Sequence, residues 1–153
     1  MNHQQTADLF QLWLKEQIPL IGHMGLGDPV YDGRSLTLTA ALAPNVNDKG
    51  TGFGGSLATL ATLCGWAIVT LYLREQGRDC DVMIRDSQLK YLAPVLGDFT
   101  ATTTLPEQAE LDGFIAYMDS KGRARLNLDV EVRQGNKVAM TLAGAYVAVE
   151  RPS

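Results

Sequence analysis

The chain has 153 residues, 46% apolar and 20% charged, an ordinary globular composition that suits one domain covering residues 1–153. Its net charge of −4 and the lack of a long basic run argue against a nucleic-acid-binding protein, because phosphate contacts need clustered Lys and Arg. Cys64 lies in an apolar run, and the N-terminus shows no basic segment followed by an apolar stretch. We therefore expect a cytoplasmic protein without a disulfide framework or a signal peptide.

The first predicted elements are a short helix and a strand. Residues 6–17 carry an apolar stripe at helical spacing, with Thr6 as the expected N-cap, and the Ile18-Pro19 pair ends the helix. Residues 35–42 alternate between apolar and polar side chains, which predicts a strand. Residues 44–52 are rich in turn formers.

A long uncharged run follows, over residues 53–73. We expect a helix that begins near Gly54 or Gly55 and ends around Gln76, with Gly77 as the C′ residue. Its length would allow a membrane span, but Thr and Gly residues interrupt it and no Lys or Arg cluster flanks one side. A helix that is apolar on all sides also suits the buried centre of a domain, which is the interpretation we favour.

Four more strands are predicted after this helix, over residues 82–92, 98–105, 123–133 and 137–149, the last two joined by a turn at residues 134–136. Between them, Pro106 is expected to be the first residue of a short helix. Its apolar members would be Leu111, Phe114, Ile115 and Met118. The order predicts an α+β domain in which an antiparallel sheet wraps around the central apolar helix. Because one face or edge of such a sheet stays uncovered, we expect a dimer.

The start of the long helix carries a specific motif, Asn47-x-x-Gly50-Thr51-x-Phe53-Gly54-Gly55. It resembles the hotdog-fold acyl-CoA thioesterases, whose phenylacetate-pathway branch has Asn-x-x-Gly-x-x-His-Gly-Gly before its long helix. Residues 50–66 and 84–94 are most similar to the thioesterase domain at the C-terminus of YiiD-type proteins. The resemblance implies a dimeric or tetrameric hotdog fold, an acyl-CoA or acyl-carrier-protein substrate, and hydrolysis by direct water attack without a cofactor.

The physical chemistry of the motif supports a site at Gly54 and Gly55. The first N–H groups of a helix lack partners and lie at its positive end, so they can polarise a thioester carbonyl and hold its oxyanion. The Asn47 amide would orient water or substrate, and Phe53 and Ser56 beside the glycines are assigned to substrate binding. The alternative is a plain tight turn capped by Asn47; the complete spacing favours function.

Two positions depart from the thioesterase pattern. Phe53 replaces a His, and Thr62 stands where the branch has a catalytic Asp or Glu, seven residues after Gly55. Threonine cannot act unaided as a general base at neutral pH. We therefore predict that Asp86 and Ser87 contribute to catalysis across the subunit interface, together with the Thr62 hydroxyl, and that Gln88 beside them binds substrate. Strand alternation places Asp86 and Gln88 on one face and Ser87 on the other. Asp86 is the preferred base, with a surface carboxylate as the alternative.

The remaining candidates carry simpler interpretations. Cys64 is a structural thiol rather than a nucleophile, because apolar surroundings raise the pKa of a thiol. His3 and His23 lack metal-ligand spacing, so no metal is expected. Arg85, Lys90, Arg123 and Arg125 would meet a coenzyme A phosphate or simply be exposed. Three rival functions stay open: a non-catalytic acyl-thioester binder, a dehydratase or hydratase, and a structural partner of an acyltransferase.

Overall fold

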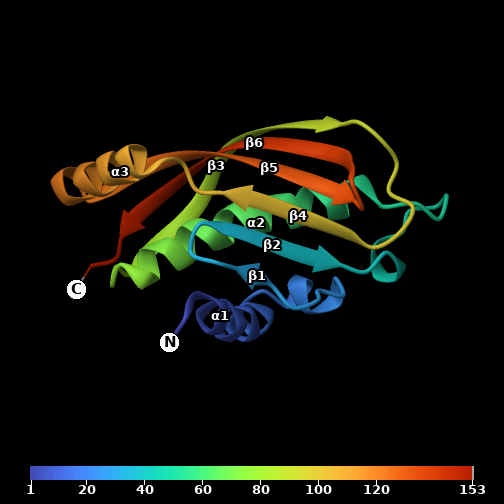
Figure 1. The fold of residues 1–153 in the computed structure, drawn as a ribbon, viewed down its shortest axis with the longest axis horizontal. Coiled ribbons are helices and arrows are strands. Elements are labelled where there is room, and N and C mark those ends of the chain that lie inside the picture. The colour runs from blue at the N-terminus through green and yellow to red at the C-terminus, as the bar shows by residue number, and fades with distance from the viewer. Residues whose placement is uncertain (153) are drawn as a thin grey trace.

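The computed structural model describes residues 1–152 and shows an antiparallel sheet curved around one long helix (Figure 1). The helices are α1 (His3–Gln17), α2 (Gly54–Glu75) and α3 (Gln108–Lys121), with short 3-10 turns η1 (Pro19–His23) and η2 (Ala43–Asn45). The strands are β1 (Val30–Tyr31), β2 (Ser35–Ala40), β3 (Cys80–Tyr91), β4 (Phe99–Thr104), β5 (Arg123–Gln134) and β6 (Lys137–Glu150). Their order is β1-β2-β4-β5-β6-β3, and every neighbouring pair is antiparallel. The predicted α+β hotdog architecture is confirmed.

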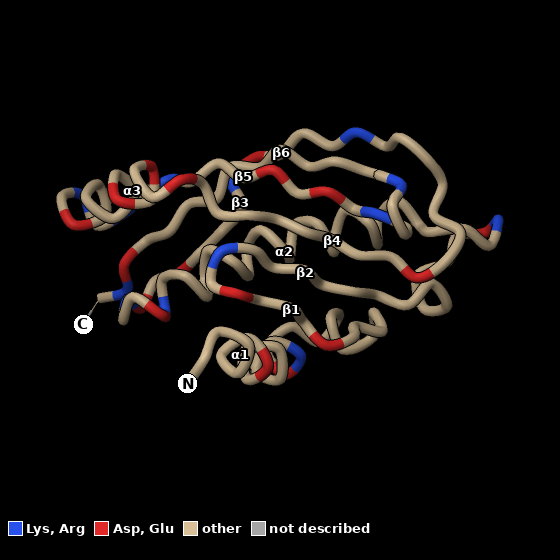
Figure 2. The backbone as a smooth tube through the Cα atoms, viewed as in Figure 1, with Lys and Arg blue, Asp and Glu red and all other residues tan. Residues whose placement is uncertain are grey.

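Helix α2 forms the centre of the core. It is the single helix among residues 1–152 that is long and apolar enough to cross a membrane, but 67% of its most apolar window is buried inside the protein. Figure 2 shows that its charged residues lie only at the C-terminal end, whereas charges elsewhere lie on the loops, on strands such as β5 and on the other helices. The apolar run is therefore explained by burial against the sheet, as the sequence predicted.

The first helix begins three residues earlier than predicted, and Thr6 is not its cap. Asn2 is the N-cap: its side chain accepts a bond from the Gln5 N–H at 2.8 Å, and the Gln5 side chain accepts one from the Asn2 N–H at 3.0 Å. Gln4, in the added turn, bonds the backbone of Pro29 and Tyr31. Such a capping box, with an anchor to β1, is stronger than a cap at Thr6.

The ends of the other two helices show one confirmed prediction and one wrong prediction. Gly77 has φ +74°, and the bonds from Gly77 N–H to Arg74 and from Arg78 N–H to Leu73 form the expected C-terminal motif of α2. Pro106, however, is not the first residue of α3, because Glu107 is the N-cap. The chain is still extended at this point, since Leu105 N–H donates to the Arg34 carbonyl at 2.8 Å.

Strand β3 lies at the edge of the sheet and contains a bulge. The register passes from Ile84 opposite Tyr146 to Asp86 opposite Ala145, so Arg85 is the extra residue. Beyond the bulge, Ser87 lies opposite Gly144, on the face that packs on α2. The bulge thus decides which β3 side chains face the helix and which face outward.

Candidate active site

The loop that enters α2 is held by Asn47 and Gly50. Gly50 has φ +79°, a backbone conformation that favours glycine, and Asn47 N–H donates to the Thr51 carbonyl at 2.8 Å. The Asn47 amide accepts from the N–H groups of Lys49 and Thr51 at 2.9 and 3.1 Å and donates to the Thr51 hydroxyl at 2.9 Å. Asn47 therefore shapes the loop in this structure, and its role toward water stays a prediction.

The N-terminus of α2 is left without a side-chain cap. Its N-cap residue is Phe53, which has no hydrogen-bonding side chain, and the Phe53 carbonyl accepts from the Ser56 and Leu57 N–H groups at 2.9 and 3.1 Å. Within residues 1–152 the N–H groups of Gly54 and Gly55 have no acceptor. Ser, Thr, Asp or Asn would ordinarily satisfy such donors. Two free donors at the positive end of a 22-residue helix are suited to an incoming carbonyl oxygen.

Two aromatic rings flank these glycines. The Phe53 ring lies against Gly55, where an added Cβ would come within 2.5 Å of it, and the Tyr91 ring lies beside Gly54. Tyr91 Oη also donates to the Gly54 carbonyl at 2.9 Å. Phe53 and Tyr91 are both exposed residues. Tyr91 was not assigned to the site from the sequence, although it closes β3 directly before the loop that contains Pro94. Ser56 is half-buried in the same turn.

Thr62 lies in an apolar groove of about 370 Å³ between η1, α2 and β3. The lining includes Ile18, Leu20, Leu63, Trp66 and Ile84. Thr59, one turn earlier, bonds the Gly55 carbonyl at 2.8 Å, whereas the Thr62 hydroxyl has no hydrogen-bond partner in residues 1–152. A free hydroxyl on an otherwise apolar wall is available to a water molecule or a substrate.

The three β3 candidates are divided between the two faces of the sheet, as alternation predicted. Ser87 shares the helix side with Leu89 and Tyr91, while Asp86 and Gln88 lie on the outer side opposite Ala145 and Ala143. All three are exposed. Within one protomer, therefore, Asp86 and Gln88 are not brought together with Gly54, Gly55 or Thr62, and Asp86 stays a predicted base that this geometry does not test.

Cys64 has the environment of a structural thiol. It is fully buried beneath the sheet, and its Sγ lies 3.5 and 3.4 Å from the carbonyl oxygens of Leu36 and Ala101. Burial raises the pKa of the thiol well above its ordinary value. Residues 1–152 contain no group of three His, Cys, Asp or Glu side chains arranged to hold a metal ion.

A sequence comparison shows the family of the chain, and structure comparisons show proteins of similar fold. Residues 7–150 match the family described as "Putative thioesterase (yiiD_Cterm)". The chain belongs to this family. Its fold is similar to that of a protein of unknown function from Chlorobaculum tepidum, with 31% identity, coverage of 98% of both chains and a TM-score of 0.91. A "putative thioesterase" from Shewanella oneidensis is 28% identical over 95% of this chain and 98% of its own, with a TM-score of 0.84. A "probable thioesterase" from Pseudomonas aeruginosa shares the fold, with 21% identity, 94% and 95% coverage and a TM-score of 0.80.

Proposed function

We propose that this member of the YiiD C-terminal family hydrolyses acyl thioesters of coenzyme A or of an acyl carrier protein. The observation that carries the proposal is the uncapped start of α2, with the free N–H groups of Gly54 and Gly55 one turn before an apolar groove. Donors of this kind stabilise the oxyanion of acyl transfer, and removing one costs roughly 10²–10³ in rate.

The proposed reaction is direct attack by water. The thioester carbonyl oxygen accepts hydrogen bonds from the N–H groups of Gly54 and Gly55, beside the rings of Phe53 and Tyr91. Water attacks the carbonyl carbon, the carbon–sulfur bond breaks, and the departing sulfur takes up a proton. The products are a carboxylic acid and the free thiol, and no cofactor is required.

The position of Thr62 favours a site made by two protomers. Thr62 follows Gly55 by seven residues, which corresponds to about 10 Å along the helix axis. A water molecule bound to Thr62 is then too far from a carbonyl held by the same helix, because a catalytic group must lie within about 3 Å of its target. We infer that Thr62 serves the glycines of a second copy, in a homodimer.

The exposed edge of β3 supports this dimer. β3 is a long strand at the end of the sheet, and one of its two edges has no hydrogen-bonded neighbour among residues 1–152. Such free edges readily pair with another chain. If two β3 edges join into one sheet, each side chain keeps its face. Ser87 would then lie on the helix side of the combined sheet, together with Thr62, and Asp86 on the outer side. We therefore propose Ser87 rather than Asp86 as the second water-orienting group.

One observation favours a second candidate function, a non-catalytic acyl-thioester binder. Among residues 1–152 no ionisable side chain lines the apolar groove, so the described part of the groove contributes no general base. Release of thiol from a panel of short, long and aromatic acyl-CoAs distinguishes the two functions. Turnover that Thr62→Ala and Ser87→Ala lower, while Asp86→Asn does not, supports the hydrolase with the proposed water site. Binding of acyl-CoA without turnover by the wild type supports the binder.

Subunit mixing tests the composite site. The Thr62→Ala variant retains the N–H donors of Gly54 and Gly55 but lacks the Thr62 hydroxyl. The Gly55→Val variant retains Thr62, but its new side chain clashes with the Phe53 ring beside the donors. If each site uses both protomers, mixed dimers contain one intact site, and an equal mixture recovers about a quarter of wild-type activity. No recovery, from variants that remain dimeric by light scattering, would place the whole site in one protomer.

A further inference from the structure

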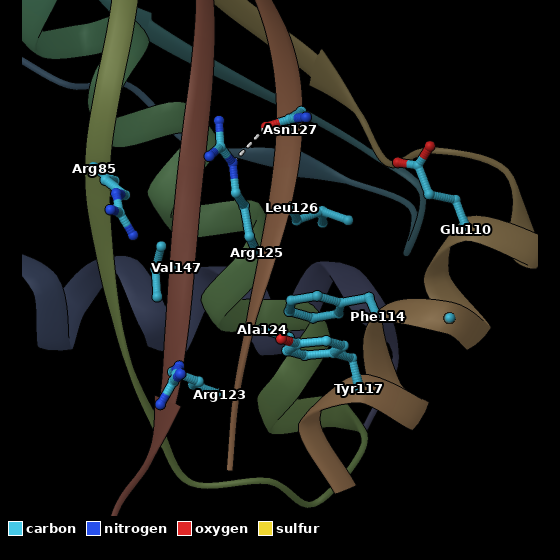
Figure 3. A pocket seen from close by; sticks show the side chains of 11 residues that line it. Arg85, Glu110, Phe114, Tyr117, Arg123, Ala124, Arg125, Leu126, Asn127 and Val147 are labelled. Atoms are coloured by element: carbon cyan, nitrogen blue, oxygen red, sulfur yellow. Dashed lines mark hydrogen bonds between the residues drawn. The ribbon is translucent and has the colours of Figure 1, made fainter. Parts of the chain in front are cut away.

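A second hollow, of about 680 Å³, lies on the outer face of the sheet beside α3 (Figure 3). β4 pairs with β5 only over Val130–Arg133, so it leaves the edge of the first half of β5 free, and α3 packs there instead. The helix thus forms a wall along an otherwise flat outer sheet surface. The resulting volume falls within the roughly 300–1,000 Å³ that is usual for small-molecule sites.

Three arginines from two strands line this hollow. Arg123 and Arg125 alternate with buried Ala124 and Leu126 along β5, so their side chains leave the sheet on its outer face. Arg85 is the extra residue of the β3 bulge, and its side chain lines the same hollow (Figure 3).

These arginines are not neutralised by the protein's own acids. Within residues 1–152 no carboxylate lies within 4.0 Å of any of the three, although the chain has more acidic than basic residues. The single side-chain hydrogen bond that these arginines make within the described residues runs from Arg125 Nε to Asn127 Oδ1, at 3.2 Å. By contrast, Arg133 pairs with Glu131 on the same strand. A cluster of unpaired guanidinium groups is suited to phosphate, which they bind with two parallel hydrogen bonds.

The wall of the hollow is aromatic. The rings of Phe114 and Tyr117 project from α3 toward β5 (Figure 3). Phe114 is buried and forms the floor, whereas Tyr117 is 52% exposed and has no side-chain hydrogen bond within residues 1–152. An exposed ring beside a hollow offers a stacking surface for a nucleobase. Glu110 lies across the hollow from Arg123 in Figure 3, where it can accept a hydrogen bond from a sugar hydroxyl or a base amino group.

We propose that this hollow binds a phosphorylated nucleotide, with Arg85, Arg123 and Arg125 on the phosphates and Tyr117 against the base. Two sources share this chemistry: the nucleotide end of coenzyme A, and a free nucleotide that acts as an effector. The first source rests on the proposed function, and the second does not. Because the site is concave and has an aromatic wall, it suits a small ligand better than the flat surface of an acidic protein partner.

Calorimetric titration of the full chain tests the proposal, with coenzyme A, 4′-phosphopantetheine, ADP and inorganic phosphate as probes. The expected result is that Arg123→Ala weakens nucleotide binding about 10- to 100-fold, as the loss of a charge-assisted hydrogen bond requires. Tyr117→Ala should weaken it about tenfold while Tyr117→Phe retains it, because stacking needs the ring and not the hydroxyl. Lys137→Ala removes an exposed cation at the far end of β5 and β6, and this control should bind normally.

The outcomes distinguish coenzyme A from a free nucleotide as the ligand, and they test the nucleotide site separately from the proposed hydrolase activity. Tight binding of coenzyme A, with weaker binding of phosphopantetheine and ADP, identifies the nucleotide end of a substrate. Binding of ADP that coenzyme A does not displace identifies a free nucleotide. The proposal fails if the wild type binds neither coenzyme A nor ADP, or if Arg123→Ala and Tyr117→Ala bind as the wild type does. Hydrolysis of N-acetylcysteamine thioesters, which lack a nucleotide, reports on the catalytic proposal alone.

Discussion

Replacing Gly65 by Ala tests how closely Tyr146 is packed against the middle of α2. Gly65 lies in the middle of the helix, and a methyl group there would overlap both the ring and the hydroxyl of Tyr146. Tyr146 is completely buried, so its ring has no free space to enter, and its hydroxyl donates to the Thr62 carbonyl at 3.0 Å. The substitution therefore strains the segment of α2 that presents Thr62 to the apolar groove.

The expected magnitude follows from one favourable and two unfavourable terms. Ala is favoured over Gly inside a helix by about 1 kcal/mol. Overpacking of a core costs about 1–3 kcal/mol, and a lost hydrogen bond adds about 0.5–1.5 kcal/mol. We expect Gly65→Ala to lower the free energy of unfolding by about 1–3 kcal/mol, and Tm by roughly 2–4 °C for each kcal/mol.

Gly113→Ala is the matched control. Gly113 is also inside a helix, α3, but a Cβ there would have no atom within 4 Å, so only the helix-propensity term applies. This variant should be more stable than the wild type by about 0.5–1 kcal/mol. Urea unfolding followed by circular dichroism measures both. If Gly65→Ala is as stable as Gly113→Ala, the packing of Tyr146 against α2 is not as described.

Three further predictions concern single groups. Tyr91→Phe removes the bond to the Gly54 carbonyl and should cost about 0.5–1.5 kcal/mol, whereas equal stability in urea would show that the bond contributes nothing. The N–H groups of Ser35 and Arg34 lower the pKa of Asp32, so this carboxylate stabilises the fold above its ordinary pKa and loses the effect as the pH falls through the lowered value. Asp32→Ala should therefore be less stable than the wild type near neutral pH, and the difference should shrink as the pH falls through the lowered pKa; a constant difference would contradict this. Cys64 should react with a thiol reagent only after unfolding, and native labelling that peptide mass spectrometry assigns to Cys64, rather than to the half-buried Cys80, would contradict its burial.

Much of the fold followed from local sequence. The apolar run over residues 53–73 and Gly77 defined α2, because a helix without charges must be buried and a glycine with positive φ ends it. The alternation in β5 and β6 likewise predicted their pairing through a tight turn. The predicted start of α1 was wrong, because the local Asn2–Gln5 capping box was overlooked, and the contact of Gln4 with the backbone of Pro29 and Tyr31 adds to it. That contact joins residues 25 or more positions apart, which no local pattern reveals.

The candidate site was likewise predictable from the sequence in one part and only from the tertiary structure in another. The sequence alone indicated Gly54 and Gly55, since a helix start with a Phe N-cap and no capping side chain depends only on adjacent residues. The tertiary structure alone decided that Thr62 has a free hydroxyl in a groove, that Ser87 rather than Asp86 faces the helix, and that Tyr91 reaches Gly54. The arginine hollow is also a product of the fold, because Arg85 and Arg123 come from strands that β6 separates. Helix ends depend on a few neighbouring residues, whereas sites that join distant strands depend on register, bulges and the packing of α3.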